Sequence, residues 1–151
     1  MSSSTATAAP KKSVKPTTAS QMFVNLPVKN LQASIAFFTE LGFSFNPDFT
    51  DENATCMIIG PNLYSMLLNH SYFAGFAPRA IADGSKVCEV IVALQLDSRE
   101  QVDDVVKRAV AAGGATYNEP KDHGFMYQHG FTDLDGHVWE VFVMNGMPPK
   151  A

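Results

Sequence analysis

The chain has 151 residues, a formal net charge of −4, and a composition that is 46% hydrophobic and 17% charged. This length fits one domain, which can bury about two thirds of its unfolded surface. The composition is that of a soluble globular protein, and the negative charge gives no electrostatic reason to bind nucleic acid. No segment approaches the roughly 18 apolar residues of a membrane helix, and no signal peptide is recognisable. We therefore expect no membrane contact and a cytoplasmic location.

Residues 1–21 are predicted to form a disordered tail. Ser, Thr, Ala, Pro and Lys dominate the first 20 residues, which contain no aromatic side chain and bury too little apolar surface to offset the entropy of ordering. The lysines without acidic neighbours resemble a transit peptide, but arginine and an amphipathic period are missing. The domain is predicted to span residues 22–145, and residues 146–151 form a second tail.

The first half of the domain is predicted to be β-α-β-β-β. A strand at 22–28 precedes a helix at 31–41, for which Asn30 is the N-cap and Gly42 the stop. Alternating and apolar segments separated by turn residues then predict three short strands, at 44–49, 54–59 and 63–69.

Residues 70–86 form a connection that is longer than most loops of a compact domain. It carries Tyr72, Phe73, Phe76 and Arg79, and such aromatic side chains are expected to cover apolar surface. Two interpretations remain open: a lid over a functional site, or a cover for the open end of a sheet.

The second half repeats this order of elements. A strand at 87–96 is followed by a helix with a capping box of Ser98 and Gln101, and Gly113 marks its end. The predicted buried stripe of this helix is Val102, Val105, Val106 and Ala109. Strands are predicted at 115–118, 125–132 and 137–144. The chain thus indicates an internal duplication, with modules at about 22–70 and 87–144.

The last two strands contain the candidate chemistry. Period-two alternation puts Glu140 between apolar neighbours on its face, and a carboxylate is costly to bury without a partner. A four-residue turn at 133–136 would set His129 opposite Glu140, on one face with Tyr127 and Phe142. Trp139 would point to the helices. A His and a carboxylate in an apolar patch are typical of general acid–base catalysis, but a structural ion pair has the same pattern.

Residues 23–43 and 131–141 (FTDLDGHVWEV) together resemble the vicinal oxygen chelate superfamily, which includes glyoxalase I, bleomycin-resistance proteins and extradiol dioxygenases. The resemblance covers about residues 22–144 and is strongest to small glyoxalase-like members. It implies an α+β fold of two β-α-β-β-β modules, whose mixed sheets form an open cup around a ligand or metal, and a homodimer.

The resemblance also implies metal ligands on the first and last strands of each module. Glu140 matches the final carboxylate ligand, and it is the only possible metal ligand that matches. Phe23, Met66 and Ile91 stand where the others would fall, with Asn25, Asn69 or Glu89 a residue or two away. About three protein ligands make a catalytic site, so a full metal site is not expected. Cys56 and Cys88 form no metal-binding spacing and are predicted to be reduced thiols in the core.

Two functions follow as hypotheses. The first is a binding protein without a cofactor, which holds a small organic molecule against Tyr127, Phe142, Phe23 and Asn25. The second is an enzyme similar to lactoylglutathione lyase, in which Glu140 and His129 act as catalytic residues, with or without a divalent metal. A dioxygenase-like activity is the other enzymatic alternative that the resemblance implies.

Overall fold

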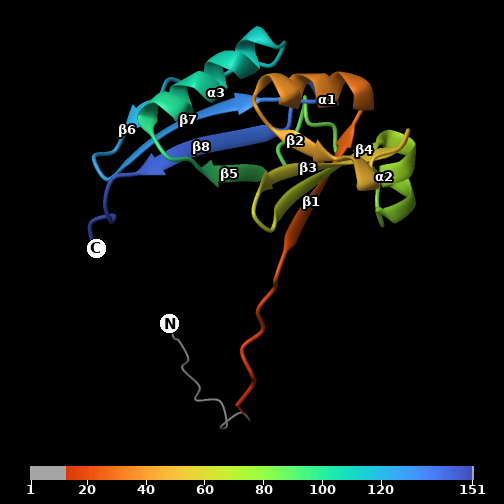
Figure 1. Cartoon of the computed structure of the whole chain (residues 1–151), viewed down its shortest axis with the longest axis horizontal. Helices are drawn as coiled ribbons and strands as arrows, with labels where there is room; N and C mark the ends of the chain where they lie inside the picture. The colour runs from red at the N-terminus through yellow and green to blue at the C-terminus, as the bar shows by residue number, and fades with distance from the viewer. Residues whose placement is uncertain (1–12, 151) are drawn as a thin grey trace, which may run out of the picture.

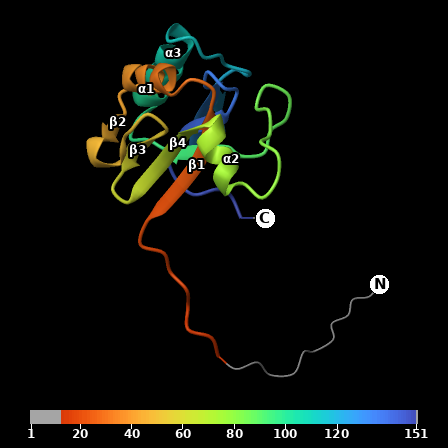
Figure 2. The ribbon, with the colours of Figure 1, turned by 90° about the vertical axis from the view of Figure 1, so that its right-hand side faces the viewer.

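The structure is a computed structural model that describes residues 13–150. Two four-stranded mixed sheets lie side by side, and the helices Leu31–Glu40 and Arg99–Ala111 cover one side of the molecule (Figure 1). The elements in chain order are β1 (Met22–Val28), α1 (Leu31–Glu40), β2 (Ser44–Asn46), the 3₁₀ helix η1 (Pro47–Phe49), β3 (Ala54–Gly60), β4 (Leu63–Asn69), α2 (His70–Phe76), β5 (Ile91–Gln95), α3 (Arg99–Ala111), β6 (Lys121–Asp122), β7 (Met126–Thr132) and β8 (Val138–Met144). The predicted disorder of residues 1–12 lies outside the described residues, and residues 13–21 form exposed coil before β1 (Figure 2).

The two sheets have the same topology, which confirms the predicted α+β fold class. The first has the strand order β1-β4-β3-β2 and the second β5-β8-β7-β6. In each, the first strand runs parallel to the last strand of its module, and the remaining pairs are antiparallel. A parallel pair needs a crossover connection, and α1 and α3 provide it.

The helices begin and end at the residues that the sequence indicates. Asn30 accepts a hydrogen bond from the N–H of Ala33, and Ser98 accepts one from the N–H of Gln101. The Gln101 side chain accepts from the N–H of Asp97, so the return bond of the predicted capping box reaches the residue before the N-cap and not Ser98 itself. Gly42 and Gly113 adopt positive φ angles of 100° and 108° just after their helices, where glycine carries no steric cost.

One continuous hydrophobic core lies between the sheets and the helices α1 and α3. All four residues of the predicted α3 stripe are buried, and they pack in the same cluster as Phe37 and Phe38 of α1. Trp139 is fully buried, with its ring centroid 5.3 Å from that of Phe38 and 6.2 Å from that of Phe131. Trp139 thus packs behind β8, toward the helices, as predicted.

Four predicted elements differ in the structure. Proline prevents β2 from continuing beyond Asn46, and η1 takes its place. The strand predicted from residue 87 begins only at Ile91, and the strand predicted at 115–118 is reduced to one bridge between Ala115 and Thr132. The start of the long connection is helical, as α2, because the Asn69 side chain caps the N–H of Tyr72.

The turn between β7 and β8 joins the two modules. Asp135 accepts a hydrogen bond of 2.8 Å from the N–H of Lys29, and the ring of His137 lies 2.7 Å from the carbonyl oxygen of Pro27. The backbone of Gly84, in the long connection, lies against that of Gly136: a Cβ on Gly136 would be 2.6 Å from the Gly84 oxygen. Module one, the turn and the connection therefore meet at one point.

Candidate functional site

The sheets present one face to the helices and leave the other face open. On β8, Trp139, Val141 and Val143 are buried on the helix side, whereas Val138, Glu140 and Phe142 are half-buried on the open side. On β1, Leu26 and Val28 belong to the core, and Phe23 and Asn25 lie on the alternate face. These open faces are the surface of the predicted cup.

The predicted pairing of His129 with Glu140 is wrong. The register pairs Thr132 with Val138, so His129 lies opposite Val141 and Glu140 lies opposite Gly130. The turn contains one residue more than expected, and a shift of one residue moves a side chain to the other face. His129 and Glu140 are therefore on opposite faces of the sheet.

The ring of His129 is held on the helix side, at the edge of the second module. Its Nε2 lies 2.9 Å from the carbonyl oxygen of Asn118 and 3.1 Å from the Thr116 hydroxyl, which itself donates to the carbonyl oxygen of Gly130. These contacts hold the 116–118 segment against β7. His129 thus has a structural role at the edge of the sheet, and it does not reach the open face.

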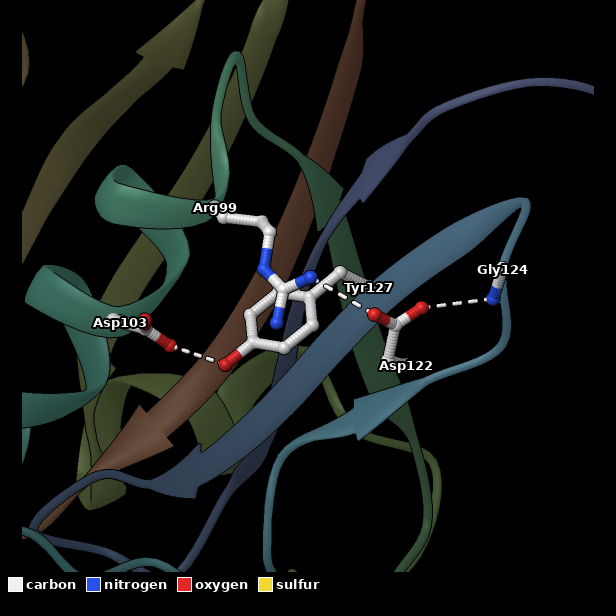
Figure 3. A network of polar contacts seen from close by, with 5 residues as sticks. All are labelled: Arg99, Asp103, Asp122, Gly124 and Tyr127. Carbon is white, nitrogen blue, oxygen red and sulfur yellow. Dashed lines mark hydrogen bonds and ion pairs between the residues drawn. The ribbon is translucent and has the colours of Figure 1, made fainter.

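Tyr127 also lies on the helix side, in a network of polar contacts (Figure 3). Its hydroxyl donates a 2.6 Å hydrogen bond to Asp103, and the Arg99 guanidinium lies 4.0 Å above its ring centroid. Arg99 pairs with Asp122 at 2.8 Å. The hydrogen bond to Asp103, followed by burial, raises the pKa of Tyr127. This predicted ligand contact instead connects the start of α3 to β6 and β7.

The other predicted residues share the open side but come from separate sheets. Glu140 and Phe142 lie on the open face of β8, and Phe23 stacks on Tyr64, with ring centroids 4.8 Å apart. Asn25 is exposed on the same side of β1 as Phe23. Of the six predicted site residues, these four are on the open side of the sheets, and His129 and Tyr127 are not.

A cavity of about 540 Å³ lies at the seam between the two modules. Asn25 and Pro27 of β1 and Leu68 of β4 line it from the first module, and Val138 of β8 lines it from the second. Phe73 and Phe76 of α2 cover it together with the connection after α2 (residues 77–90), which contributes Arg79, Ala80, Ile81, Val87, Cys88, Glu89 and Val90 among others. The lining is mainly apolar, with a few polar groups. A volume of this size suits a small organic ligand.

The connection is the part of the site that sequence reasoning described least. Its length and aromatic side chains indicated a lid or a cover, and Phe73 and Phe76 do line the cavity. Val87, Cys88 and Val90 were predicted as strand and therefore were not considered as lining residues. The prediction that Cys88 is a core thiol is wrong, because this residue is exposed in the connection. No local pattern marks such residues, because the cavity is formed by segments from both modules.

Sequence reasoning also missed Tyr117. It is 47% exposed, and the hydroxyl end of its ring lies over Gly130, the partner of Glu140. Burial raises the pKa of Tyr117, and the negative charge of Glu140 adds to this effect. The phenol is therefore close enough to Glu140 to experience its charge. The only sequence signal is Gly130, since glycine inside a strand often permits a close approach.

Comparisons with known proteins agree with this architecture. The sequence model of the bleomycin resistance protein-like N-terminal family matches residues 21–60. A hypothetical protein from S. aureus is 29% identical, with 84% of this chain and 95% of that chain covered and a TM-score of 0.71. These matches confirm the predicted resemblance to the vicinal oxygen chelate superfamily. The search of curated proteins found no match.

Other solved structures have the same fold at lower identity. A glyoxalase/bleomycin resistance protein/dioxygenase from Nocardioides is 23% identical, with a TM-score of 0.69 and coverage of 91% of this chain and 93% of that chain. The fosfomycin resistance protein FosX from Listeria monocytogenes is 20% identical, with a TM-score of 0.62 and coverage of 89% and 97%. At these identities the likeness concerns the fold.

The metal-ligand set that the resemblance implies does not fit the residues of this chain. Within residues 13–150, no group of three or more His, Cys, Asp or Glu side chains is arranged to hold a metal ion. Phe23 and Met66, which stand near two of the implied ligand positions, carry no oxygen or nitrogen donor in the side chain. We therefore derive no step through a metal.

Proposed function

We propose that this protein binds a small, largely apolar organic molecule at the seam between its modules. The observation that carries the proposal is the 540 Å³ cavity, to which both modules contribute and which the 77–90 connection covers. Ligand sites are commonly concave and apolar with a few polar groups, and this cavity has that composition. The names of related structures, which include bleomycin and fosfomycin resistance proteins, support binding of a small molecule.

The proposal can be tested with 4-phenylbutan-1-ol, a neutral molecule with an apolar body, by isothermal titration calorimetry or ligand-observed NMR. We expect saturable binding in the micromolar to millimolar range, which is usual for so small a ligand. Ala80→Trp should fill the cavity from the exposed connection and weaken binding at least tenfold. Ala74→Trp, on an exposed position of α2 outside the lining, is the matched control. Equal binding by the two variants, or no saturable binding, would contradict the proposal.

A second candidate is proton transfer, as in lactoylglutathione lyase. The observation in its favour is that Glu140 is half-buried on the open face and forms no ion pair within residues 13–150. Such a carboxylate can act as a general base if a carbonyl substrate binds beside it. The direct assay is isomerisation of the glutathione hemithioacetal of methylglyoxal, with Zn²⁺ or Ni²⁺ supplied. Turnover that Glu140→Gln abolishes would support this candidate, and lack of turnover would reject it.

The homodimer and the cytoplasmic location stay predictions. The exposed apolar side chains Phe23, Leu63, Val90 and Ile91 lie on or beside the edge strands, where a second copy would cover them. Light scattering coupled to size-exclusion chromatography gives the mass directly, and a value near 16.4 kDa at micromolar concentration would contradict the dimer. No helix in residues 13–150 is long and apolar enough to cross a membrane.

A further inference from the structure

Four residues form a row across the open face of the second sheet. The strand register aligns Gly130 with Glu140 and Glu140 with Ala93. The bridge between Ala115 and Thr132 is antiparallel, so Tyr117 continues the row beside Gly130. The order across the sheet is thus Tyr117, Gly130, Glu140, Ala93.

The small residues in this row make room around Glu140. A Cβ placed on Gly130 would overlap the hydroxyl and the ring carbons of Tyr117, so the tyrosine occupies the space that any larger residue would fill. Ala93, on the other side, contributes only a methyl group. The ring of Tyr117 and the carboxylate of Glu140 are therefore neighbours across one missing side chain.

Glu140 has no charge partner in this position. Within residues 13–150 its carboxylate forms neither an ion pair nor a hydrogen bond, and its neighbours along the open face of β8 are Val138 and Phe142. A carboxylate among apolar side chains is stabilised by a positive charge. The face of an aromatic ring also attracts cations. Tyr117 and Glu140, which flank Gly130, are thus both suited to bind a cation.

We propose that Tyr117 and Glu140 bind the cationic end of the ligand, so that the ligand is an organic amine or a quaternary ammonium ion with an apolar body. This inference rests on the proposed function. Tyr117 is the specificity-determining residue, because its ring provides a wall for the cation while Glu140 provides the counter-charge.

The cavity and the Tyr117–Glu140 pair are close enough for one ligand. Val138, which lines the cavity, precedes Glu140 by two residues on the same face of β8, a separation of about 7 Å. Cys88 also lines the cavity, and the negative charge of its thiolate contributes to the raised pKa of Tyr117, so the two residues lie within electrostatic range of each other. A ligand with its apolar body in the cavity can therefore place its cation at Glu140.

The competing outcome is an anionic ligand, since Arg79 also lines the cavity. Arg79 lies on the exposed connection, whereas Glu140 lies on the half-buried floor of the sheet, where charge interactions are less screened by water. The structure thus favours the cation, and a direct comparison of ligand charges decides between them.

The experiment compares three probes of one shape: 4-phenylbutylamine, 4-phenylbutan-1-ol and 4-phenylbutyrate. We expect the full-length protein to bind the amine about tenfold more tightly than the alcohol, and the carboxylate most weakly. Glu140→Gln should make amine and alcohol bind equally. Tyr117→Ala should weaken amine binding by about three- to tenfold, and Tyr117→Phe should retain it, because the ring is kept. Tyr64→Ala, an aromatic truncation on the open face of the first sheet, is the matched control and should leave the amine-to-alcohol ratio unchanged.

The possible results distinguish failure of the cation site from failure of the proposed function. Equal binding of amine and alcohol, tighter binding of the carboxylate, or a preference for the amine that survives Glu140→Gln would overturn the cation site while the proposed function stands. If none of the three probes binds, the proposed function and the inference both fail. Circular dichroism and thermal unfolding of each variant establish that it is folded, and Tyr117→Phe keeps the test of the ring valid if Tyr117→Ala unfolds.

Discussion

The carboxylate of Asp133 determines the shape of the turn between β7 and β8. Asp133 is 6% exposed and accepts three hydrogen bonds: from the Trp139 indole at 3.0 Å, and from the N–H groups of Asp135 and His137 at 2.9 and 3.0 Å. The N–H of Asp133 also donates to the carbonyl oxygen of His137. These contacts close a turn that includes His137, so that Val138 becomes the first residue of β8 and Glu140 faces the open side.

Removal of the Asp133 carboxylate should be strongly destabilising. Asp133→Ala leaves the buried indole N–H and two backbone N–H groups without their acceptor, and each unsatisfied buried donor costs about 1–3 kcal/mol. We expect a total loss of about 2–4 kcal/mol in the free energy of unfolding, since some donors will reach water. Urea denaturation followed by Trp139 fluorescence measures it. A loss below about 0.5 kcal/mol, the range of neutral surface substitutions, would show that the carboxylate does not organise the turn.

Asp133 also makes the stability of the protein depend on pH, and the direction of this dependence follows from its raised pKa. Burial raises the pKa of Asp133, and the His137 charge and the hydrogen bonds oppose this only in part. Because the folded pKa lies above the unfolded value of about 3.9, the contribution of Asp133 to stability is complete below that value and falls as pH rises through the folded pKa. The stability of wild type relative to Asp133→Asn should therefore decrease as the pH rises above about 3.9. A stability difference between wild type and Asp133→Asn that increases with pH would contradict the raised pKa of Asp133.

At the scale of helices and strands, features set by nearby residues were predicted correctly, whereas the pairing of β7 with β8 was not. The caps at Asn30 and Ser98 and the stripe of α3 were predicted correctly, because they depend on residues three or four positions apart. The register of β7 and β8 was predicted wrongly by one residue, because it depends on how the Asp133 side chain folds the turn. The strand predicted at 115–118 is irregular, since Thr116 bonds to β7 through its side chain.

The cap of α3 offers a test of this local determination. Ser98→Ala removes the oxygen that accepts from the N–H of Gln101 at 3.1 Å, so one N–H at the helix start loses its partner. We expect the free energy of unfolding to fall by about 1 kcal/mol. Ser13→Ala, in the exposed coil before β1, is the matched control. An equal effect of the two substitutions in chemical denaturation would argue against capping as the cause.

At the scale of the whole molecule, one small region connects the two modules and the cover of the cavity. The turn at 133–137 bonds to Lys29 and Pro27 of the first module, and Gly136 lies against Gly84 of the connection. Sequence reasoning predicted the duplication and the open sheets but not this junction. Its contacts with the first module join residues that are more than 100 positions apart, such as Lys29 and Asp135, which differ by 106.

Gly136 is a position in this junction where any side chain is poorly tolerated. Its φ is +82°, and a Cβ would be 2.6 Å from the Gly84 oxygen, so Gly136→Ala combines backbone strain with a steric clash. We expect a loss of about 1–3 kcal/mol in stability, together with weaker binding of 4-phenylbutan-1-ol as the connection moves off the cavity. Gly146→Ala, where a Cβ would meet nothing within 4 Å, is the control. Unchanged stability and binding in Gly136→Ala would mean that the contact does not position the connection.

The most direct test of the central claim, that the seam between the modules is the ligand site, is to map ligand contacts by NMR. Titration of the isotopically labelled protein with 4-phenylbutylamine should shift backbone signals in the 77–90 connection and at Asn25 and Val138, and should leave the outer surface of α3 unchanged. Shifts confined to the helix side of the molecule, or no saturable shifts at millimolar ligand, would contradict it.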